Sequence, residues 1–572
     1  MEKVTNLKSL FNQFNIEGYI IPKNDEFFGE YVDEKKDRLK HISNFTGSYG
    51  FALILKKKNY LFTDGRYLLQ AKIESSKKFN ISIIPKKLPF KVLKNKKIII
   101  GFDPKLFTEM SLKRIFINTK CKLLPIKDNL PDLVTKIKSK SQNKKFFLLK
   151  KKDAGQSREN KISKLVSKLK RNKFNAQFIS APENVAWLLN LRGGDSEFSP
   201  IPNCYAIVSK ERKVSLFCEL NKINKLTRKS LKSINFVNIE DVEKFLETIR
   251  NKKIQIDKNS CSIFFKDIIE KNNKIIETQD PIYILKSIKN KTEIRNMTKT
   301  HILDGVAVTK FLFWIKNNFR FKKITEISAQ EKLLKFRKNN KNFKMLSFPT
   351  ISGSGPNGAI VHYRANEKSN RTIKKGDIYL NDSGGQYAFG TTDVTRTISL
   401  ENKNKRIKEI FTRVLKGHIA VANYKITTNT YGSKIDLAAR KYLHQINLDY
   451  SHGTGHGVGY FLNVHEGPQA LSKGNKINFK EGMILSNEPG YYEKGKFGIR
   501  IENLITIKKI NKKLKFVNLT LIPIDKSLIQ KKLLSRNEID WLNNYHRNVY
   551  KNLKKYMNNV ELKQLKIDCS NI

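Results

Sequence analysis

Cysteine is scarce in this chain, and long apolar runs are missing. Its 572 residues include five cysteines (Cys121, Cys204, Cys218, Cys261 and Cys569), none of them in a Cys-x-x-Cys pair. This scatter argues against a disulfide framework or a thiolate zinc site and fits a reducing compartment. No apolar run approaches the roughly 18 residues of a membrane helix. The N-terminal segment has an acidic second residue and no apolar core of signal length, so we expect a cytoplasmic protein without a membrane partner.

Acidic residues are few compared with basic ones. Lys and Arg number 111 against 52 Asp and Glu, which gives a formal net charge of +59. A surplus of this size attracts polyanions such as nucleic acid or an anionic membrane. It is mostly lysine, however, and it accompanies Asn and Ile along the whole chain, so A- and T-rich codons explain it as well. No nucleic-acid-binding motif supports the first interpretation, and we expect no nucleic-acid partner.

Apolar residues are nevertheless sufficient for several cores, at 39% of the chain. The length predicts about three domains. Strand-like runs and helical stretches alternate over residues 1–143, and residues 144–284 repeat that order, which predicts two similar α/β domains. A third domain, residues 285–572, begins with a long amphipathic helix and ends in a helical extension from about residue 525. The fold class is therefore α/β (α+β).

Carboxylates in unusual company appear in three segments of the third domain. In "IYLNDSGGQYAFGTTDVTRTISL" a strand ends at Asp382 and a returning strand holds Asp393, so antiparallel pairing lets the two side chains face each other. In "GMILSNEPGYY" a strand ends at Glu488. In "FGIRIENLITI" a period of two places Arg500 and Glu502 on one face of a strand.

Three of the nine histidines lie in "HGTGHGVGYFLNVH", residues 452–465. The spacing of His452 and His456 fits one face of a helix or one side of a strand. Gly453, Gly455 and Gly457 argue against the helix, at about 1 kcal/mol each relative to Ala. They also let the backbone approach a site closely and leave the His456 ring unobstructed.

Four inward-facing carboxylates repel one another, and each buried charge needs a counter-charge. Together with His456 they form an oxygen-rich donor set that suits a pair of divalent cations, Mn²⁺ first, with Co²⁺, Zn²⁺ or Fe²⁺ as alternatives. Two such ions about 3.5–4 Å apart share a bridging hydroxide, which is a nucleophile near neutral pH. For five of the six histidines outside this stretch we expect surface or core packing: His41, His301, His418, His444 and His546.

These strings resemble the signatures of the Xaa-Pro aminopeptidases, most closely those of the long, three-domain cytosolic aminopeptidase P. The similarity covers nearly the whole chain and includes "LFTDGRYLLQA", "ENVAWLLNLRGGD", "SFPTISGSGPNGAIVHY" and "EIDWLNNYH". It implies two creatinase- or prolidase-like α/β domains followed by a pita-bread catalytic domain. It also implies a homodimer that hydrolyses the bond between an N-terminal residue and a following proline through a metal-bridging hydroxide.

The resemblance also implies residue roles. The five metal ligands would be Asp382, Asp393, His456, Glu488 and Glu502, with Asp393 and Glu502 bridging the two ions. His362 and His465 would contact the substrate and stabilise the tetrahedral intermediate, and Glu488 would carry the proton to the leaving nitrogen. Arg66 would reach the substrate from the first domain. His452, Tyr492 and Arg500 would support the substrate site.

Three other functions are compatible with parts of the same pattern. Methionine aminopeptidase lacks the two N-terminal domains. Prolidase requires a free C-terminus on its substrate, and the full-length match to the three-domain form weighs against it. A pita-bread binding module without metals suits the charge of +59, but all five ligand types are present here. A metal titration separates that module from the enzymes.

Overall fold

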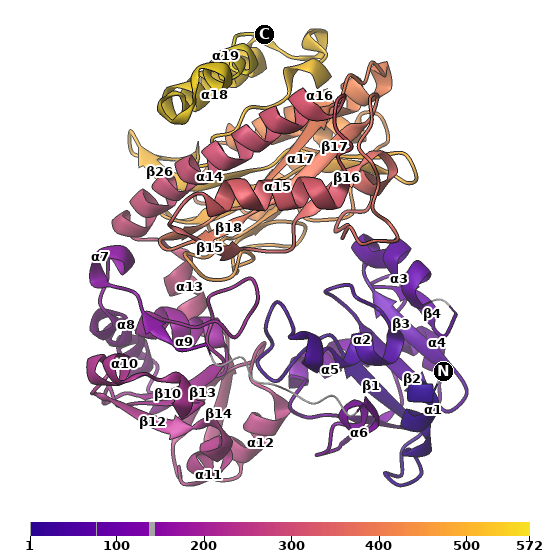
Figure 1. Ribbon diagram of the computed structural model, residues 1–572. Coiled ribbons are helices and arrows are strands. Elements are labelled where there is room, and N and C mark those ends of the chain that lie inside the picture. Colours follow the sequence, from indigo (N-terminus) through magenta and orange to yellow (C-terminus); the bar gives the residue numbers. More distant parts are fainter. Residues whose placement is uncertain (1, 76, 136–143) are drawn as a thin grey trace. The chain divides into compact units, whose positions relative to one another are not determined.

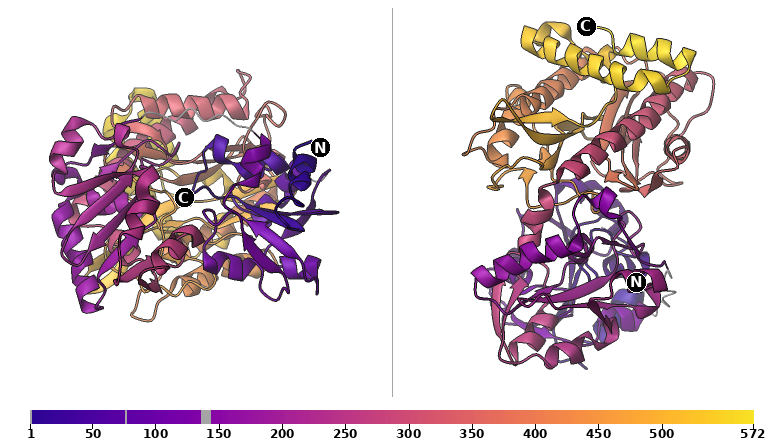
Figure 2. Two further views of the ribbon diagram at one scale, coloured as in Figure 1. Left: turned by 90° about the horizontal axis from the view of Figure 1, so that it is seen from below. Right: turned by 90° about the vertical axis from the view of Figure 1, so that its left-hand side faces the viewer.

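The computed structural model describes residues 2–75, 77–135 and 144–572 (Figures 1 and 2). The chain divides into unit 1, residues 1–151 and 156–283, and unit 2, residues 152–155 and 284–572. The predicted boundary between 143 and 144 lies at the edge of residues 136–143, which are outside the described residues, so it stays a prediction. Among the described residues, no helix is both long and apolar enough to cross a membrane.

Unit 1 holds two six-stranded sheets with the same topology. In the first sheet β1 (Gly18–Pro22) pairs antiparallel with β2 (Phe51–Leu55) and parallel with β5 (Ile99–Phe102). In the second sheet β8 (Ala176–Ile179) pairs antiparallel with β10 (Cys204–Ser209) and parallel with β13 (Lys253–Asp257). The repeated α/β pattern expected from the sequence is therefore confirmed. The other strands are β3 (Asn59–Thr63), β4 (Asn80–Ile83) and β6 (Lys122–Pro125) in the first sheet, β11 (Val214–Cys218), β12 (Ile234–Asn238) and β14 (Lys274–Thr278) in the second, and the short pair β7 (Phe147–Leu148) and β9 (Leu191–Arg192).

Several helices of unit 1 begin at side-chain caps. Ser157 accepts from the backbone N–H of Asn160 at 3.3 Å before α8 (Arg158–Arg171), whose buried face includes Leu165 and Leu169. The others in or bordering this unit are α1 (Glu2–Ser9), α2 (Arg38–Ser43), α3 (Leu68–Ser75), α4 (Pro89–Leu93), α5 (Glu109–Ile115), α6 (Leu130–Thr135), α7 (Lys151–Ala154), α9 (Pro182–Leu189), α10 (Lys225–Ser230), α11 (Val242–Glu247), α12 (Ile263–Glu270) and α13 (Pro281–Ser287).

Unit 2 is built from several small antiparallel sheets. One has the order β16 (Ile351–Ser354), β17 (Ile378–Ser383), β20 (Val394–Ser399), and another has the order β23 (Ile484–Asn487), β26 (Asn503–Ile510), β27 (Lys513–Asn518). The remaining strands are β15 (Phe343–Leu346), β18 (Gly385–Tyr387), β19 (Gly390–Thr391), β21 (Gly455–His456), β22 (Ala470–Leu471), β24 (Gly490–Glu493) and β25 (Phe497–Arg500). Most of the predicted ligands lie at the ends of these strands.

Helices enclose these sheets. They are α14 (Lys291–Asn318), α15 (Glu326–Lys338), α16 (Lys405–Ala422), α17 (Gly432–His444), α18 (Arg536–Leu553) and α19 (Asn559–Asp568). The last two, yellow in Figure 2, contact α14 and confirm the helical extension predicted from about residue 525. Leu542, Val549 and Leu565 belong to the same apolar core as Phe411 of α16. The extension is therefore part of the core of unit 2.

Candidate metal centre

Two antiparallel strands carry the first two predicted ligands. β17 and β20 pair so that Asp382 lies opposite Thr395, and Asp393 directly precedes β20. The segment between them, predicted as a turn, instead forms the hairpin β18–β19, which also pairs with β15. The hairpin brings the chain back beside β17, so the two aspartates come from paired strands. Both are buried, at 8% and 4% exposure.

His456 and Glu488 come from neighbouring strand ends. Glu488 directly follows β23, and its Oε1 accepts from the Ser486 hydroxyl at 3.0 Å. The same hydroxyl oxygen accepts from the backbone N–H of His456 at 2.9 Å. A Cβ on Gly455 would lie 2.0 Å from the carbonyl oxygen of Ser486. Glycine at position 455 therefore lets this backbone lie close against β23, whereas its predicted role in approaching the site stays a prediction.

Asp393, His456 and Glu502 form a group that could hold a metal ion, because one ligand atom of each lies within 4.8 Å of the others. The His456 Nε2 is 3.4 Å from Asp393 Oδ2 and 3.5 Å from Glu488 Oε1. Glu502 is 1% exposed, and its Oε2 accepts from the Thr395 hydroxyl at 2.9 Å. Three carboxylates and one imidazole thus meet in one buried region.

Asp382 is held by an arginine at the edge of this group. Arg500 Nη2 donates to its Oδ2 at 2.6 Å, whereas its Oδ1 is buried with no hydrogen-bond partner among the described residues. A buried acceptor without a partner costs about 1–3 kcal/mol. A cation would satisfy this oxygen, so Asp382 fits the donor set expected for a divalent metal.

Burial and mutual repulsion shift the titration of these acids. Burial, together with the carboxylates of Asp393 and Glu488, raises the pKa of Asp382 to about 7 despite the guanidinium beside it. Burial and neighbouring carboxylates also raise the pKa of Glu488 and, by more, that of Glu502. Burial alone would lower the pKa of His456, but Asp393 and Glu488 raise it to about 9. So many acids in one interior require positive charge nearby, and divalent cations supply it.

A chain of polar contacts leads from the acids to His452. Arg500 Nη1 donates to the Tyr492 hydroxyl at 2.5 Å, and that hydroxyl is 2.8 Å from His452 Nε2. Arg500 Nε donates to the Thr395 hydroxyl, which in turn donates to Glu502. The sequence did not single out Thr395, although it lies two residues after Asp393, where a period of two would have included it.

Two details of the expected backbone are wrong. The single strand predicted for residues 497–507 is two strands, β25 and β26, which belong to different sheets and are separated by residues 501–502. Arg500 and Glu502 still share a side, since both contact Thr395. His452 lies in neither a helix nor a strand, because β21 covers Gly455–His456 alone in this stretch. Its spacing from His456 therefore reports neither periodicity.

His465 lies beside the group, with its ring centroid 4.2 Å from that of His456. The next residue, Glu466, is buried, and its carboxylate lies 2.6 Å from Lys289 Nζ and 3.4 Å from Lys286 Nζ. Burial would raise the pKa of Glu466, but the two lysines lower it. This buried ion cluster holds the backbone next to His465. His465 itself is exposed.

Of the remaining predicted substrate residues, one lies close to Arg500 in unit 2 and the other belongs to unit 1. His362 is half-buried and follows Val361, whose carbonyl oxygen accepts from Arg500 at 3.4 Å. Arg66 belongs to unit 1, where its Nη2 pairs with Asp64 Oδ2 at 2.7 Å. Its role toward substrate stays a prediction. The five other histidines are as expected: His301, His418 and His546 are buried, His41 is half-buried and His444 is exposed.

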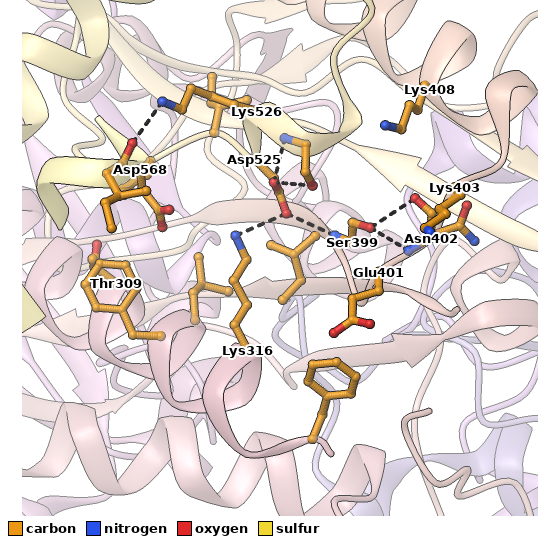
Figure 3. A pocket seen from close by; sticks show the side chains of 18 residues that line it. Thr309, Lys316, Ser399, Glu401, Asn402, Lys403, Lys408, Asp525, Lys526 and Asp568 are labelled. Carbon is orange, nitrogen blue, oxygen red and sulfur yellow. Dashed lines mark hydrogen bonds and ion pairs between the residues drawn. The ribbon is translucent and has the colours of Figure 1, made fainter. Parts of the chain in front are cut away.

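A separate cavity of about 540 Å³ in unit 2 contains none of the predicted site residues (Figure 3). Apolar side chains such as Leu312 and Phe313 line it together with lysines and acids. Its Asp525 is already satisfied, because Oδ2 lies 3.2 Å from Lys316 Nζ and accepts from the backbone N–H of Ser399 at 3.0 Å. This cavity is therefore a weaker candidate for a metal site than the acids around His456.

Family models match the chain in four consecutive stretches. Residues 295–509 match metallopeptidase family M24, and residues 512–572 match the C-terminal region of that family. Residues 3–129 and 138–293 each match a creatinase/prolidase N-terminal domain. Together these stretches account for nearly the whole sequence.

Named relatives are similar over almost their full length. "Probable Xaa-Pro aminopeptidase P" of Laccaria bicolor is 38% identical, with 95% of this chain and 89% of the relative aligned. "Xaa-Pro aminopeptidase 1" of Dictyostelium discoideum is 36% identical, over 96% and 92%. The crystal structure of X-prolyl aminopeptidase from Caenorhabditis elegans, described as a cytosolic enzyme with a di-nuclear active site, superposes with a TM-score of 0.93 at 30% identity, covering 100% and 99% of the two chains. The chain belongs to the Xaa-Pro aminopeptidases of metallopeptidase family M24.

Proposed function

We propose that this protein is a dinuclear metallo-aminopeptidase that releases an N-terminal residue from peptides with proline in the second position. The observation that carries this proposal is the buried group of acids around His456, with an unsatisfied Asp382 oxygen at its edge. The full-length similarity to Xaa-Pro aminopeptidases and to a di-nuclear enzyme supports the same conclusion.

The residues that would hold two divalent cations are Asp382, Asp393, His456, Glu488 and Glu502, with Asp393 and Glu502 shared between the ions. Their oxygen-rich character favours Mn²⁺, with Co²⁺, Zn²⁺ or Fe²⁺ as alternatives. Such a pair of ions, when bound, supplies an activated water as nucleophile and polarises the scissile carbonyl group.

The protein's own side chains orient the substrate and move the proton. His465 and His362 would donate hydrogen bonds to the carbonyl oxygen as negative charge develops there; one such donor is typically worth about 10²–10³ in kcat. Glu488, whose pKa is raised, would hold the proton and deliver it to the prolyl nitrogen. Any peptide nitrogen must gain a proton to leave as an amine, and the prolyl nitrogen, which carries no N–H before cleavage, then leaves as a secondary amine.

The surroundings of the reaction are also proposals. We place the protein in the cytoplasm, as the C. elegans relative is described as cytosolic, and expect a homodimer. Residues 1–143, 144–284 and 285–572 are our proposed domains. Arg66, His452, Tyr492 and Arg500 complete the proposed substrate site.

Hydrolysis of Arg-Pro-Pro with and without Mn²⁺ tests the function. We expect release of free arginine only, and no cleavage of Arg-Ala-Ala. A prolidase would cut the dipeptide Arg-Pro but leave the tripeptide intact, because it requires a free C-terminus next to the cleaved bond. A binding module would cut neither peptide and would hold no stoichiometric Mn²⁺. Either result would overturn the proposal.

A further inference from the structure

A buried ion pair lies in the interior of unit 2, outside the set of predicted ligands and substrate contacts. Asp304 of α14 and Arg337 of α15 are 2% and 0% exposed. Arg337 Nε donates to Asp304 Oδ1 at 2.8 Å, and its Nη2 donates to Oδ2 at 3.1 Å. Burial would raise the pKa of Asp304, but Arg337 outweighs this effect and lowers it, so both groups are charged. A bidentate pair of this kind has a fixed geometry.

The pair reaches both ends of the segment that joins the first two predicted ligands. Arg337 Nη2 also donates to the hydroxyl of Ser383, the residue directly after Asp382, at 3.2 Å. Asp304 Oδ2 accepts from the hydroxyl of Thr392, the residue directly before the second ligand, at 2.9 Å. One ion pair between two helices therefore contacts the hydroxyl of the residue next to each of the two ligands.

The hairpin between the ligands is tied to the same pair. The Tyr387 hydroxyl of β18 donates to Asp304 Oδ1 at 2.8 Å. The Thr392 hydroxyl also accepts from the backbone N–H of Gly385 at 2.9 Å, which closes the base of the hairpin. Tyr387 is 0% and Thr392 is 1% exposed. Every member is buried, and within the described residues each makes at least two hydrogen bonds or ion-pair contacts except Tyr387, while Arg337 Nη1 alone among the guanidinium nitrogens has no partner there. These contacts leave the segment little freedom to open.

We propose that the Asp304–Arg337 pair is a positioning device that holds Asp382 and Asp393 at a metal-binding separation before any cation arrives. Without metal the two carboxylates repel, and a loosely held hairpin would let them move apart. The proposal rests on the dinuclear site proposed above. Removing a residue that orients metal ligands without touching the metal typically lowers metal affinity by about 10–100-fold.

Thr392→Val tests the device without leaving a buried charge unpaired. The substitution preserves side-chain shape and removes the hydroxyl through which Asp304 contacts the residue before Asp393. Thr392→Ser keeps the hydroxyl. Thr309→Val is the matched control, since Thr309 is a fully buried threonine on α14 that lines the cavity of Figure 3. For each metal-free protein, calorimetry measures Mn²⁺ dissociation constants, and thermal unfolding measures the midpoint without metal.

We expect the weaker of the two Mn²⁺ ions to bind Thr392→Val about 10–100-fold less tightly, with Thr392→Ser and Thr309→Val like the wild type. Ser383→Ala, which removes the contact at the other end, should weaken Mn²⁺ binding in the same direction and carries the test if Thr392→Val does not fold. Unchanged dissociation constants with a lowered metal-free midpoint would show a merely structural pair and overturn the proposal. A wild-type protein that binds no Mn²⁺ would instead refute the proposed function.

Discussion

At the scale of single residues, the centre depends on acids that the interior does not tolerate alone. Burial and neighbouring carboxylates raise the pKa of Asp382 to about 7, and one of its oxygens has no hydrogen-bond partner in the described part of the chain. Glu502 is almost fully buried beside two further carboxylates. Bound cations would offset the cost of burying these charges and would also satisfy the free Asp382 oxygen.

Asp393→Ala removes the acid at the centre of the proposed site. We expect loss of Mn²⁺-dependent hydrolysis of Arg-Pro-Pro and the loss of at least one Mn²⁺ per chain, because Asp393 would contact both ions. Peptide assays together with metal analysis after dialysis check this result. Asp540→Ala, at a half-buried site on the surface of α18, is the control. Undiminished activity in Asp393→Ala would refute the ligand assignment.

Tyr492→Phe separates substrate support from metal binding. The variant loses the hydroxyl that contacts His452 and Arg500. We expect kcat/KM for Arg-Pro-Pro to fall about tenfold, which corresponds to the loss of about 1.4 kcal/mol, with the Mn²⁺ content unchanged. Steady-state kinetics and metal analysis on the same preparation test this. Wild-type kinetics would remove Tyr492 from the substrate site.

The residue types of the candidate site were predictable, but their partners were not. The five proposed ligands stand in recognisable strings, and their strand-end positions follow from local pattern. Thr395 shares the period-two side of Asp393, but its contact with Glu502 and that of Ser486 with His456 join segments that are distant in sequence. The hydroxyl of Thr395 reaches Glu502, which lies 107 residues further along. Such contacts depend on strand register, which one sequence does not fix.

At the scale of helices and strands, periodic segments were predicted well and short irregular ones were not. The pairing of β17 with β20 follows from two apolar runs around a glycine-rich segment. The hairpin β18–β19 was missed, because strands of three and two residues are too short to show a period. β25 and β26 looked like one strand, although they pair with different neighbours, β24 and β23. Tertiary pairing decides such breaks.

Helix α18 carries a pH-sensitive contact away from the metal centre. Its buried His546 accepts the backbone N–H of Ile524 through Nε2 at 3.1 Å, which requires a neutral ring. Burial, with Lys526 and Arg396 nearby, lowers the pKa of His546 from 6.5 to about 3. Between these values the unfolded chain binds a proton that the folded protein does not. Folding stability is therefore lost as the pH falls from 6.5 toward 3.

His546→Gln should remove this part of the pH dependence. We expect the free energy of unfolding of the metal-free variant to fall less steeply with acid than that of the wild type, by up to about 1.4 kcal/mol per pH unit below pH 6. Urea unfolding at pH 7, 6 and 5 measures it. His444→Gln, an exposed histidine on α17, is the control. Equal slopes in both variants would mean that folding does not lower the pKa of His546.

At the scale of the whole molecule, the repeated topology of the two unit 1 sheets was visible as a repeated order of strand-like and helical runs. The break near residue 284 was visible as a proline followed by a long amphipathic helix. Contacts such as that of the extension with α14 were not, because they join ends of the chain that share no local pattern. The charge of +59 gave no direct information on fold.

That charge leads to a prediction about partners. If genome composition accounts for it, DNA binding should be purely electrostatic. We expect equal affinity for A·T-rich and G·C-rich duplexes, and a decrease of at least about tenfold between 50 and 200 mM salt. Fluorescence anisotropy with labelled duplexes measures both. Tight, sequence-dependent binding at physiological salt would instead assign the basic surface a nucleic-acid function.

We propose above that the buried acids of unit 2 hold two dications. Anomalous diffraction from crystals of the Mn²⁺-loaded protein tests it most directly. We expect two manganese peaks per chain, coordinated by Asp382, Asp393, His456, Glu488 and Glu502. No peak, a single peak, or manganese bound elsewhere while these side chains remain metal-free would contradict the claim.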